Sequence, residues 1–354
     1  MTKRFGVHTL TRELPSLENL DVVDPGTAIT AVKAAVGGLA AAPVVKKSLL
    51  KAMGRLIAGV ADVPAAWLES KAQVIRDETA ARSAVNAELA RAAVHAIGGD
   101  PALGERSLKY LGARILREQA NREFVAAAAA EELRANPPAE DSETEISADW
   151  LDVFSRFAES RSDQDVQLYF AKVLAGEIRK PGSFSPATMD ALARLSPTAA
   201  KLFQLACAIT TCFCDYPQVE PALIVEPIGR AGQNALKPFG LSYSALTVLQ
   251  SAGLIHTDLN AWRELPKGIF ASTVAIGGKR TRLVETSGQP PVGFDPNTPI
   301  RFNAINLTQA GCEIQTIVHA EPNAEYLGRL KAWIASTVGL PLAQADGVPS
   351  PATR

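Results

Sequence analysis

The first strong hydrophobic pattern lies between residues 43 and 61. Its apolar positions recur at three- and four-residue steps, as on one face of an α-helix, and basic residues occupy the opposite arc. The pattern predicts an amphipathic helix, the second of two between Gly26 and Ala61. Its apolar residues are Val45, Leu49, Met53, Leu56 and Val60, and its basic residues are Lys47, Lys51 and Arg55, with Lys46 beside them.

Two longer helices follow in the hydrophobic pattern. The run from Ala65 to Ile97 has no interior Gly or Pro and stops at Gly98-Gly99, where a helix would end. Asp100-Pro101 then starts a second helix, which we expect over Leu103–Arg134. Both are rich in alanine, and small side chains allow helices to approach closely. We therefore expect these two helices to form an antiparallel hairpin.

Shorter helices with clear boundaries are predicted in the middle of the chain. The stretch 137–146 is acidic and has no basic counterpart, which is typical of a solvated linker. Ser-Pro pairs at 185–186 and 196–197 supply an N-cap followed by proline, the usual start of a helix. The predicted helices are Ser147–Ser160, Asp163–Arg179, Pro186–Arg194 and Pro197–Cys214.

After residue 215, short β-branched runs and frequent Gly and Pro replace the helical pattern. A helix over Ser242–Ser251 is expected there, with strands near 269–276, 281–284 and 300–307 and a further helix opening at Thr308. The fold class is therefore mainly α: a long N-terminal helical hairpin, a compact helical middle domain and a small C-terminal α+β unit. The expected divisions are a poorly ordered N-terminus (1–24), an N-terminal helical region (25–136), an acidic linker (137–146), a helical domain (147–215), the α+β unit (216–339) and a disordered tail (340–354).

Composition places the chain among folded proteins. It has 354 residues, of which 47% are hydrophobic and 21% charged, and this composition excludes wholesale disorder. Four irregularly placed cysteines make no disulfide framework, the N-terminus resembles no export segment, and no uncharged stretch is long enough to span a bilayer. We expect a cytoplasmic protein with no transmembrane helix.

The formal net charge of −1 hides a local separation of charge. Residues 26–61 hold five basic and no acidic residues, whereas residues 137–152 hold six acidic and no basic ones. This complementarity leads to the hypothesis that the acidic linker shields the basic helix, either within one chain or between subunits.

Enzyme motifs are absent from the sequence. There is no G-x-S-x-G, H-E-x-x-H or G-x-G-x-x-G motif, and the histidines are scattered. The segment Gly277–Arg280 lacks both the first glycine and the final Ser or Thr of a phosphate loop. Cys207, Cys212 and Cys214 sit in an apolar run, which favours core packing over a metal site. We therefore expect no catalytic residue, cofactor, metal or small-molecule substrate, and a hydrolase with an unrecognised site ranks last.

The segment Leu174–Ser185, which reads LAGEIRKPGSFS, resembles the signature of a bacterial family known as domain of unknown function 2806. Ser147–Leu151 and Pro64–Leu68 also resemble that family, and the likeness extends from about residue 44 to residue 317. The family brings no established chemistry. We interpret Glu177 as structural, either in a helix-end ion pair or as a cap on the following turn. The other motif residues assigned a structural role are Pro181, Gly182, Ser183, Phe184 and Ser185.

Two C-terminal segments, Ala245–Ile255 and Leu307–Ile314, resemble the helix-to-wing and post-wing helix of winged-helix proteins. Helices followed by such a unit are similar to the abortive-infection alpha group, and this resemblance implies a role in phage defence. The wing turn would carry Lys279, Arg280 and Arg282, which suit phosphate contacts. The candidate recognition helix has no Arg or Lys, however, which argues against readout of the major groove.

Three hypotheses for function follow. The leading one is a non-enzymatic bacterial protein that self-associates or binds a protein partner through its N-terminal helices. The second is a membrane-active effector, peripheral to the inner membrane, that places segment 26–61 on an anionic surface through Lys46, Lys47, Lys51 and Arg55. The third is a nucleic-acid-binding regulator that uses the wing residues.

Overall fold

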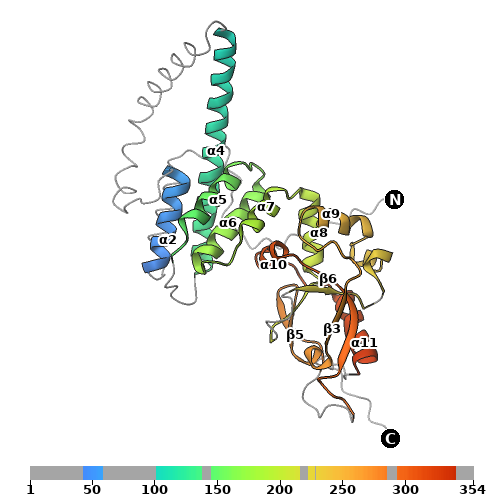
Figure 1. The fold of residues 1–354 in the computed structure, drawn as a ribbon. Helices are drawn as coiled ribbons and strands as arrows, with labels where there is room; N and C mark the ends of the chain where they lie inside the picture. Colours follow the sequence, from blue (N-terminus) through green and yellow to red (C-terminus); the bar gives the residue numbers. More distant parts are fainter. Residues whose placement is uncertain are drawn as a thin grey trace, which may run out of the picture.

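The computed structural model describes residues 43–58, 101–137, 145–215, 222–227, 229–284 and 293–339. The expectations for the N-terminus (1–24), the helix Ala65–Ile97 with the antiparallel hairpin it would form, and the tail (340–354) lie outside these residues. Within them the chain is mostly helical, and a C-terminal part contains an antiparallel sheet. Figure 1 shows a helical body on one side and a sheet body on the other.

The helical body is assembled on α4 (Pro101–Ala135). α2 (Pro43–Met53), α5 (Ala148–Glu159) and α6 (Gln164–Arg179) all pack against α4, and α7 (Pro186–Ala193) packs on α5 and α6. A π-helical turn, η2 (Gly54–Ala58), extends α2. Several alanines of α4 are fully buried, because their small side chains let neighbouring helices approach closely. The described parts of the expected helical region 25–136 and of the helical domain 147–215 therefore share one core.

The ends of the helices follow local signals in the sequence. Asp163 caps α6 by accepting from Val166 N at 3.1 Å, and Ser196 caps α8 (Pro197–Cys207) by accepting from Ala199 N at 3.1 Å. Ser242 caps α9 (Tyr243–Ser251) in the same way. Each cap pairs a backbone N–H that would otherwise lack a partner inside the helix. The predicted starts of these helices agree with the structure.

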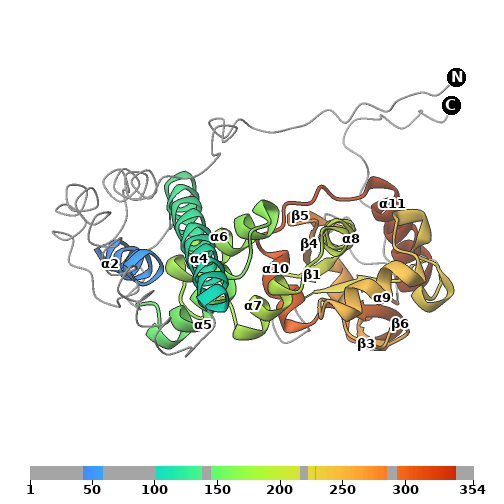
Figure 2. The same cartoon turned by 90° about the horizontal axis from the view of Figure 1, so that it is seen from above.

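Six antiparallel strands form the sheet in the order β3-β6-β2-β1-β4-β5. Each edge strand pairs with one antiparallel neighbour: β3 pairs with β6, which comes much later in the chain, and β5 forms a hairpin with β4. Figure 2 shows the sheet body from above. The strands are β1 (Thr211–Phe213), β2 (Leu223–Val225), β3 (Trp262–Pro266), β4 (Thr273–Ile276), β5 (Lys279–Arg282) and β6 (Pro299–Asn306).

Helices α10 (Gln309–Gln315) and α11 (Ala324–Trp333) complete this body. The fully buried Tyr326 of α11 donates its hydroxyl proton to Val225 O at 2.8 Å, which fixes the helix against β2. Rings of Phe270, Phe302 and Trp333 meet edge to face beneath the sheet. Short turns fill the connections: η3 (Ala231–Gln233), η4 (Lys237–Phe239), η5 (Lys267–Ala271) and the π-helical η6 (Ile334–Val338).

Three predictions about elements were wrong in detail. The helix expected over Pro197–Cys214 ends at Cys207, because its last residues pair with β4 as strand β1. The strand expected over 269–276 begins only at Thr273, after a 3-10 turn. β3 was not expected, because its alternating apolar and charged residues gave too short a run. The C-terminal sheet is therefore larger than predicted, and its first strand comes from the region assigned to helices.

The two segments that resemble winged-helix phrases lie in direct contact. Thr308 N donates to Leu254 O at 3.1 Å, and Thr308 Oγ1 donates to Gly253 O at 2.6 Å. A Cβ on Gly311 would stand 2.0 Å from Leu254 O, a distance that no side chain tolerates. Only glycine permits this close approach of α10 to the chain after α9.

We expect Gly311→Ala to lower the free energy of unfolding by about 2–4 kcal/mol, since the backbone at Leu254 must move to admit a methyl group. Gly328→Ala is the matched control, because a Cβ there meets no atom within 4 Å and alanine favours the helix. Urea unfolding of both variants measures the difference. Equal stability of the two variants would contradict the packing described here.

Candidate functional site

The N-terminal half of α4 extends beyond the helical body, as Figure 1 shows. The helix has 35 residues and is about 52 Å long at 1.5 Å per residue. Its C-terminal half is core, with Val125, Ala126, Ala129 and Leu133 fully buried. Helices α2, α5 and α6 cover the apolar face of this half only.

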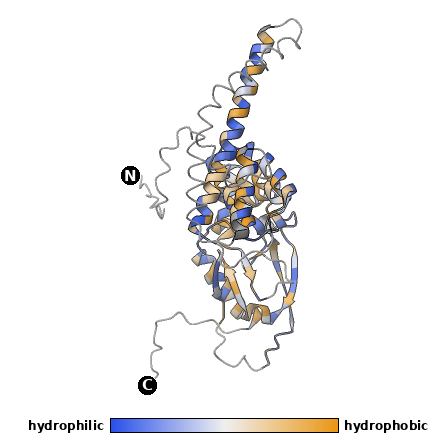
Figure 3. Cartoon of the chain, turned by 90° about the vertical axis from the view of Figure 1, so that its left-hand side faces the viewer, coloured by the Kyte–Doolittle hydropathy of each residue, from blue (hydrophilic) through white to orange (hydrophobic). Residues whose placement is uncertain are grey.

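The same apolar face continues along the projecting half. Leu111 and Ile115 precede Ala129 and Leu133 by about five full turns, so they share one side of the helix. Yet Leu111 is 50% and Ile115 is 52% exposed, whereas Ala129 and Leu133 are 0% exposed. Figure 3 shows hydrophobic residues recurring along this half up to its tip. We name the exposed side chains of Leu111 and Ile115 the α4 stripe.

Charged side chains beside the α4 stripe are paired within the helix. Lys109 Nζ lies 2.7 Å from Glu105 Oε1, and Arg114 Nε lies 2.6 Å from Glu118 Oε1. The bond to Lys109 holds the pKa of Glu105 below its usual value. Such i,i+4 pairs support the helix modestly. Besides these pairs, Arg106 and Arg117 add positive charge to the projecting half.

The basic residues of α2 and η2 meet the acidic segment within one chain. Lys47 Nζ lies 2.5 Å from Glu145 Oε1, and Arg55 Nη2 lies 2.6 Å from Asp152 Oδ1. Lys51 Nζ donates to Ile146 O at 3.2 Å, and Lys46 also lies on α2. The charge complementarity seen in the sequence thus corresponds to contacts between these segments.

The opposite face of the same segment is buried in the helical core. Leu49, Met53 and Leu56, the residues that a membrane-bound helix would insert into lipid, are all fully buried. Among the described residues, no helix combines the length and apolar character needed to cross a membrane. The geometry therefore gives this segment a packing partner inside the protein.

The family-like segment 174–185 forms a turn closed by two carboxylates. Glu177 Oε1 accepts from Gly182 N at 2.6 Å, and its Oε2 accepts from Phe184 N at 3.0 Å. Trp150 Nε1 donates to Phe184 O at 2.7 Å. Burial raises the pKa of Glu177, and the backbone bonds oppose that shift. Gly182 has φ +85°, which the turn requires and glycine permits.

The second carboxylate, Glu313 of α10, joins the helical body to the sheet body. Its Oε2 accepts from Ser185 N at 2.6 Å, from Ser185 Oγ at 3.0 Å and from Thr188 Oγ1 at 2.5 Å. Pro181 and Ser183 lie in the same turn, where Ser183 Oγ donates to Lys180 O. Every oxygen of Glu177 and this oxygen of Glu313 are occupied by protein donors. This arrangement suits a structural joint.

The predicted wing residues lie on the β4–β5 hairpin at one edge of the sheet. Lys279 is ion-paired with Glu321, and Arg280 is exposed on the same strand. Arg282 ends β5 and has a contact of its own. The structure therefore places these three residues on one edge strand, where Lys279 forms an exposed ion pair with Glu321.

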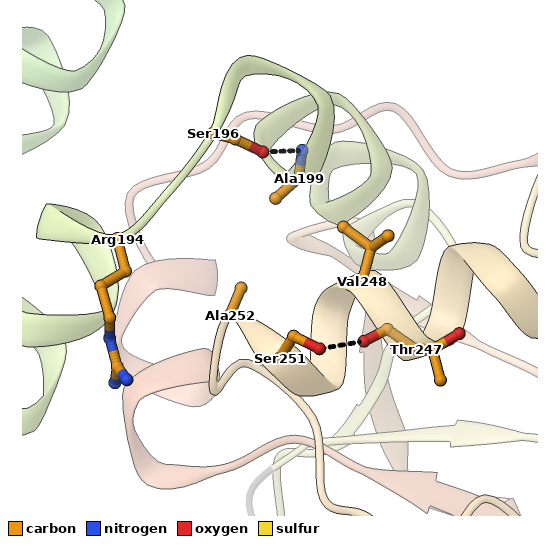
Figure 4. Close-up of a pocket in the computed structure, with 7 residues that line it drawn as sticks. All are labelled: Arg194, Ser196, Ala199, Thr247, Val248, Ser251 and Ala252. Carbon is orange, nitrogen blue, oxygen red and sulfur yellow. Dashed lines mark hydrogen bonds between the residues drawn. The ribbon is translucent and has the colours of Figure 1, made fainter.

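A pocket of about 310 Å³ lies between the start of α8 and the outer face of α9, as Figure 4 shows. Its polar side chains are engaged locally. Ser196 Oγ accepts from Ala199 N, Ser251 Oγ donates to Thr247 O, and Arg194 is ion-paired with Asp190. The pocket brings together no nucleophile and base.

The cysteines do not form a metal site in the described part of the chain. Cys207 is buried, Cys212 and Cys312 are half-buried, and Cys214 is exposed. Burial raises the pKa of the Cys207 and Cys212 thiols, which disfavours the thiolate that metals and electrophiles need. Over the described ranges, no group of three or more His, Cys, Asp or Glu is placed to hold a metal ion.

Glu226 is a buried carboxyl that sequence reasoning missed, and nothing in its neighbourhood along the chain indicates burial. Its Oε2 accepts from Ala231 N at 2.7 Å, while Oε1 is buried without a hydrogen-bond partner. Burial raises the pKa of Glu226 to about 7, although the Ala231 bond and the nearby Arg230 oppose the shift.

The chain belongs to the family described as "Protein of unknown function (DUF2806)", which matches residues 105–331. The resemblance drawn from the Leu174–Ser185 segment is thereby confirmed. No curated protein and no solved structure matches the chain.

Glu177→Gln should lower the free energy of unfolding by about 1–2 kcal/mol, because an amide keeps one acceptor oxygen and turns an NH2 group toward a backbone donor. Glu131→Gln is the matched control, since Glu131 pairs with Arg134 on an exposed face of α4. Urea unfolding gives both values. A loss in Glu177→Gln no larger than in the control would contradict the role of the carboxylate in closing the turn.

Glu226 should make the protein less stable as pH rises. The pKa of Glu226 in the folded protein, about 7, lies above the ordinary value of 4.5. Its contribution to the free energy of unfolding is therefore greatest below pH 4.5 and is lost as the pH rises toward about 7. We expect a fall of about 1–2 kcal/mol across this range, reduced from the full shift because solvent reaches part of the site.

The measurement is urea unfolding of the wild type and Glu226→Gln at about pH 5 and about pH 8. The variant should lose most of the pH dependence that Glu226 causes. Glu325→Gln, which alters an exposed carboxyl paired with Arg329, should retain it. An unchanged pH dependence in Glu226→Gln would be inconsistent with a raised pKa at this residue.

Proposed function

We propose that this protein is a non-enzymatic assembly protein that associates with a second copy of itself through the α4 stripe. One observation carries the proposal. The side of α4 that is buried at Val125 and Ala129 is apolar again, beyond Glu118 and Arg122, at exposed Leu111 and Ile115, which no other described element covers. An exposed apolar patch on a rigid element is typical of a protein interaction site.

A second copy fits the α4 stripe better than a charged partner does. Arg114, beside the stripe, is already paired with Glu118 within α4, so its charge does not strongly repel a second copy there. A Cβ built on Gly112, beside Leu111, meets no atom within 4 Å, which leaves room for close approach of another helix. The same patch on two copies gives the self-complementary contact of a two-fold dimer.

The other hypotheses rank below self-association. The membrane effector would require Leu49, Met53 and Leu56 to leave a core in which they are fully buried, at a cost of about 1.5–3 kcal/mol each. The winged-helix assignment, the phage-defence setting and the cytoplasmic location stay predictions. Nucleic-acid binding through the wing is weakened because Lys279 is engaged by Glu321.

Self-association is tested by light scattering after size-exclusion chromatography. The wild type should show at least twice the chain mass of 37.5 kDa, and Leu111→Glu/Ile115→Glu should show the chain mass alone. Two buried charges in an apolar seam should weaken association about tenfold or more.

The matched control is Ala113→Glu/Ala120→Glu, which adds the same charge to exposed positions on the far side of α4. This variant should keep the wild-type mass. A monomeric wild type would refute the proposal. So would loss of helical circular dichroism in Leu111→Glu/Ile115→Glu, because that loss would mean the stripe is covered within its own chain.

A further inference from the structure

The exposed face of the β3–β6 pair carries an indole with two arginines. Trp262 is the first residue of edge strand β3 and is 47% exposed. The Cζ atom of Arg301, on β6, lies 4.6 Å from the centre of the Trp262 ring, and that of Arg230 lies 5.7 Å away. A large aromatic side chain of this exposure thus has two cations, from separate elements, within cation–π distance of its ring.

Neither guanidinium is neutralised in a hydrogen-bonded ion pair with another described residue. Glu264 stands opposite Arg301 in the strand register without forming an ion pair, and Asp258 is exposed nearby in the preceding turn. The Glu226 carboxylate is turned inward, with its Oε2 bound to Ala231 N. The donors of both arginines therefore remain available to an anionic ligand.

The backbone that carries Arg230 is held in place. Glu226 accepts from the N–H of the next residue, Ala231, at 2.7 Å. A Cβ on Gly232 would lie 2.8 Å from the Asn260 amide, so this turn packs directly against the turn before β3. Asn303 of β6 in turn donates to Asn260 O at 3.0 Å. The two arginines and the indole are thus positioned by one connected set of contacts.

We propose that Trp262, Arg230 and Arg301 bind single-stranded nucleic acid, with a base stacked on the indole and the arginines paired with phosphates. Aromatic stacking beside cationic groups is how proteins bind single strands without reading sequence. The site lies on an open strand face, whereas a free nucleotide needs a pocket that encloses most of its surface. A nucleic-acid strand, unlike a free nucleotide, can make further contacts along the sheet, and these compensate for the openness of the site.

This inference is independent of the proposed self-association, because Trp262 lies in the sheet body and the α4 stripe lies at the far end of the helical body (Figure 1). It also differs from the wing hypothesis, since β3 and β5 form opposite edges of the sheet. The two nucleic-acid surfaces can therefore be separated by substitution.

The test is fluorescence anisotropy with a labelled, mixed-sequence single strand of about 20 nucleotides, as DNA and as RNA. The wild type should bind, and its affinity should fall as salt rises. Trp262→Ala and Arg230→Ala/Arg301→Ala should each weaken binding about tenfold or more, and Trp262→Phe should restore most of it. Arg280→Ala, on the opposite edge, is the matched control and should bind as the wild type does.

Several results would overturn the proposal. These are no binding by the wild type, equal binding by Arg230→Ala/Arg301→Ala, and a loss confined to Arg280→Ala. Adenosine monophosphate that competes as well as the unlabelled strand would assign the site to a free nucleotide. Thermal unfolding is measured for each variant, and the two-arginine variant decides the outcome if Trp262→Ala is destabilised, because both arginines are exposed.

Discussion

The apolar face of α4 is the constraint on which the helical body depends. α2, α5 and α6 each bury their own apolar residues against its C-terminal half, so removing that face would leave three helices without a core. Because side chains on one face recur with the helical period, the face cannot stop where the body ends unless the sequence changes. Charged Glu118 and Arg122 interrupt it at the edge of the body, but apolar residues on the same side resume beyond them, and the projecting half consequently exposes Leu111 and Ile115.

Carboxylates perform the joining tasks elsewhere in the structure. Glu177 closes the turn between α6 and α7, Glu313 binds the next residues of that turn from α10, and Glu226 holds the turn after β2. Each accepts from backbone N–H groups, which are strong donors when removed from water. Burial works against these hydrogen bonds, because it raises the pKa of Glu177 and Glu226 and so disfavours the charged carboxylate. These carboxylates therefore lose hydration while they hold the turns in place.

The charged surfaces of the protein differ in how far their charge is already used. Lys47, Arg55 and Lys279 have carboxylate partners within the molecule, although Lys47 and Lys279 remain largely exposed. Arg230 and Arg301 instead rest on an indole, which attracts a cation without supplying hydrogen-bond acceptors. The number of basic residues in a segment is therefore a poor guide to its binding. The partners of each residue decide it.

The sequence by itself determined the family, the helix starts at Asp163, Ser196 and Ser242, and the presence of a basic segment and an acidic one. These features rest on contacts between residues three or four apart, or on composition, which a linear chain displays directly. Tertiary structure decided that the residues after Cys207 leave the helix and pair with β4. Their backbone hydrogen bonds are made to a strand more than sixty residues away in the sequence, which local propensity does not indicate. It also decided that Lys47 meets Glu145 and that Trp262 lies within cation–π distance of Arg230 and Arg301. Such contacts depend on how helices and strands pack, and the periodicity of residues along the chain does not predict them.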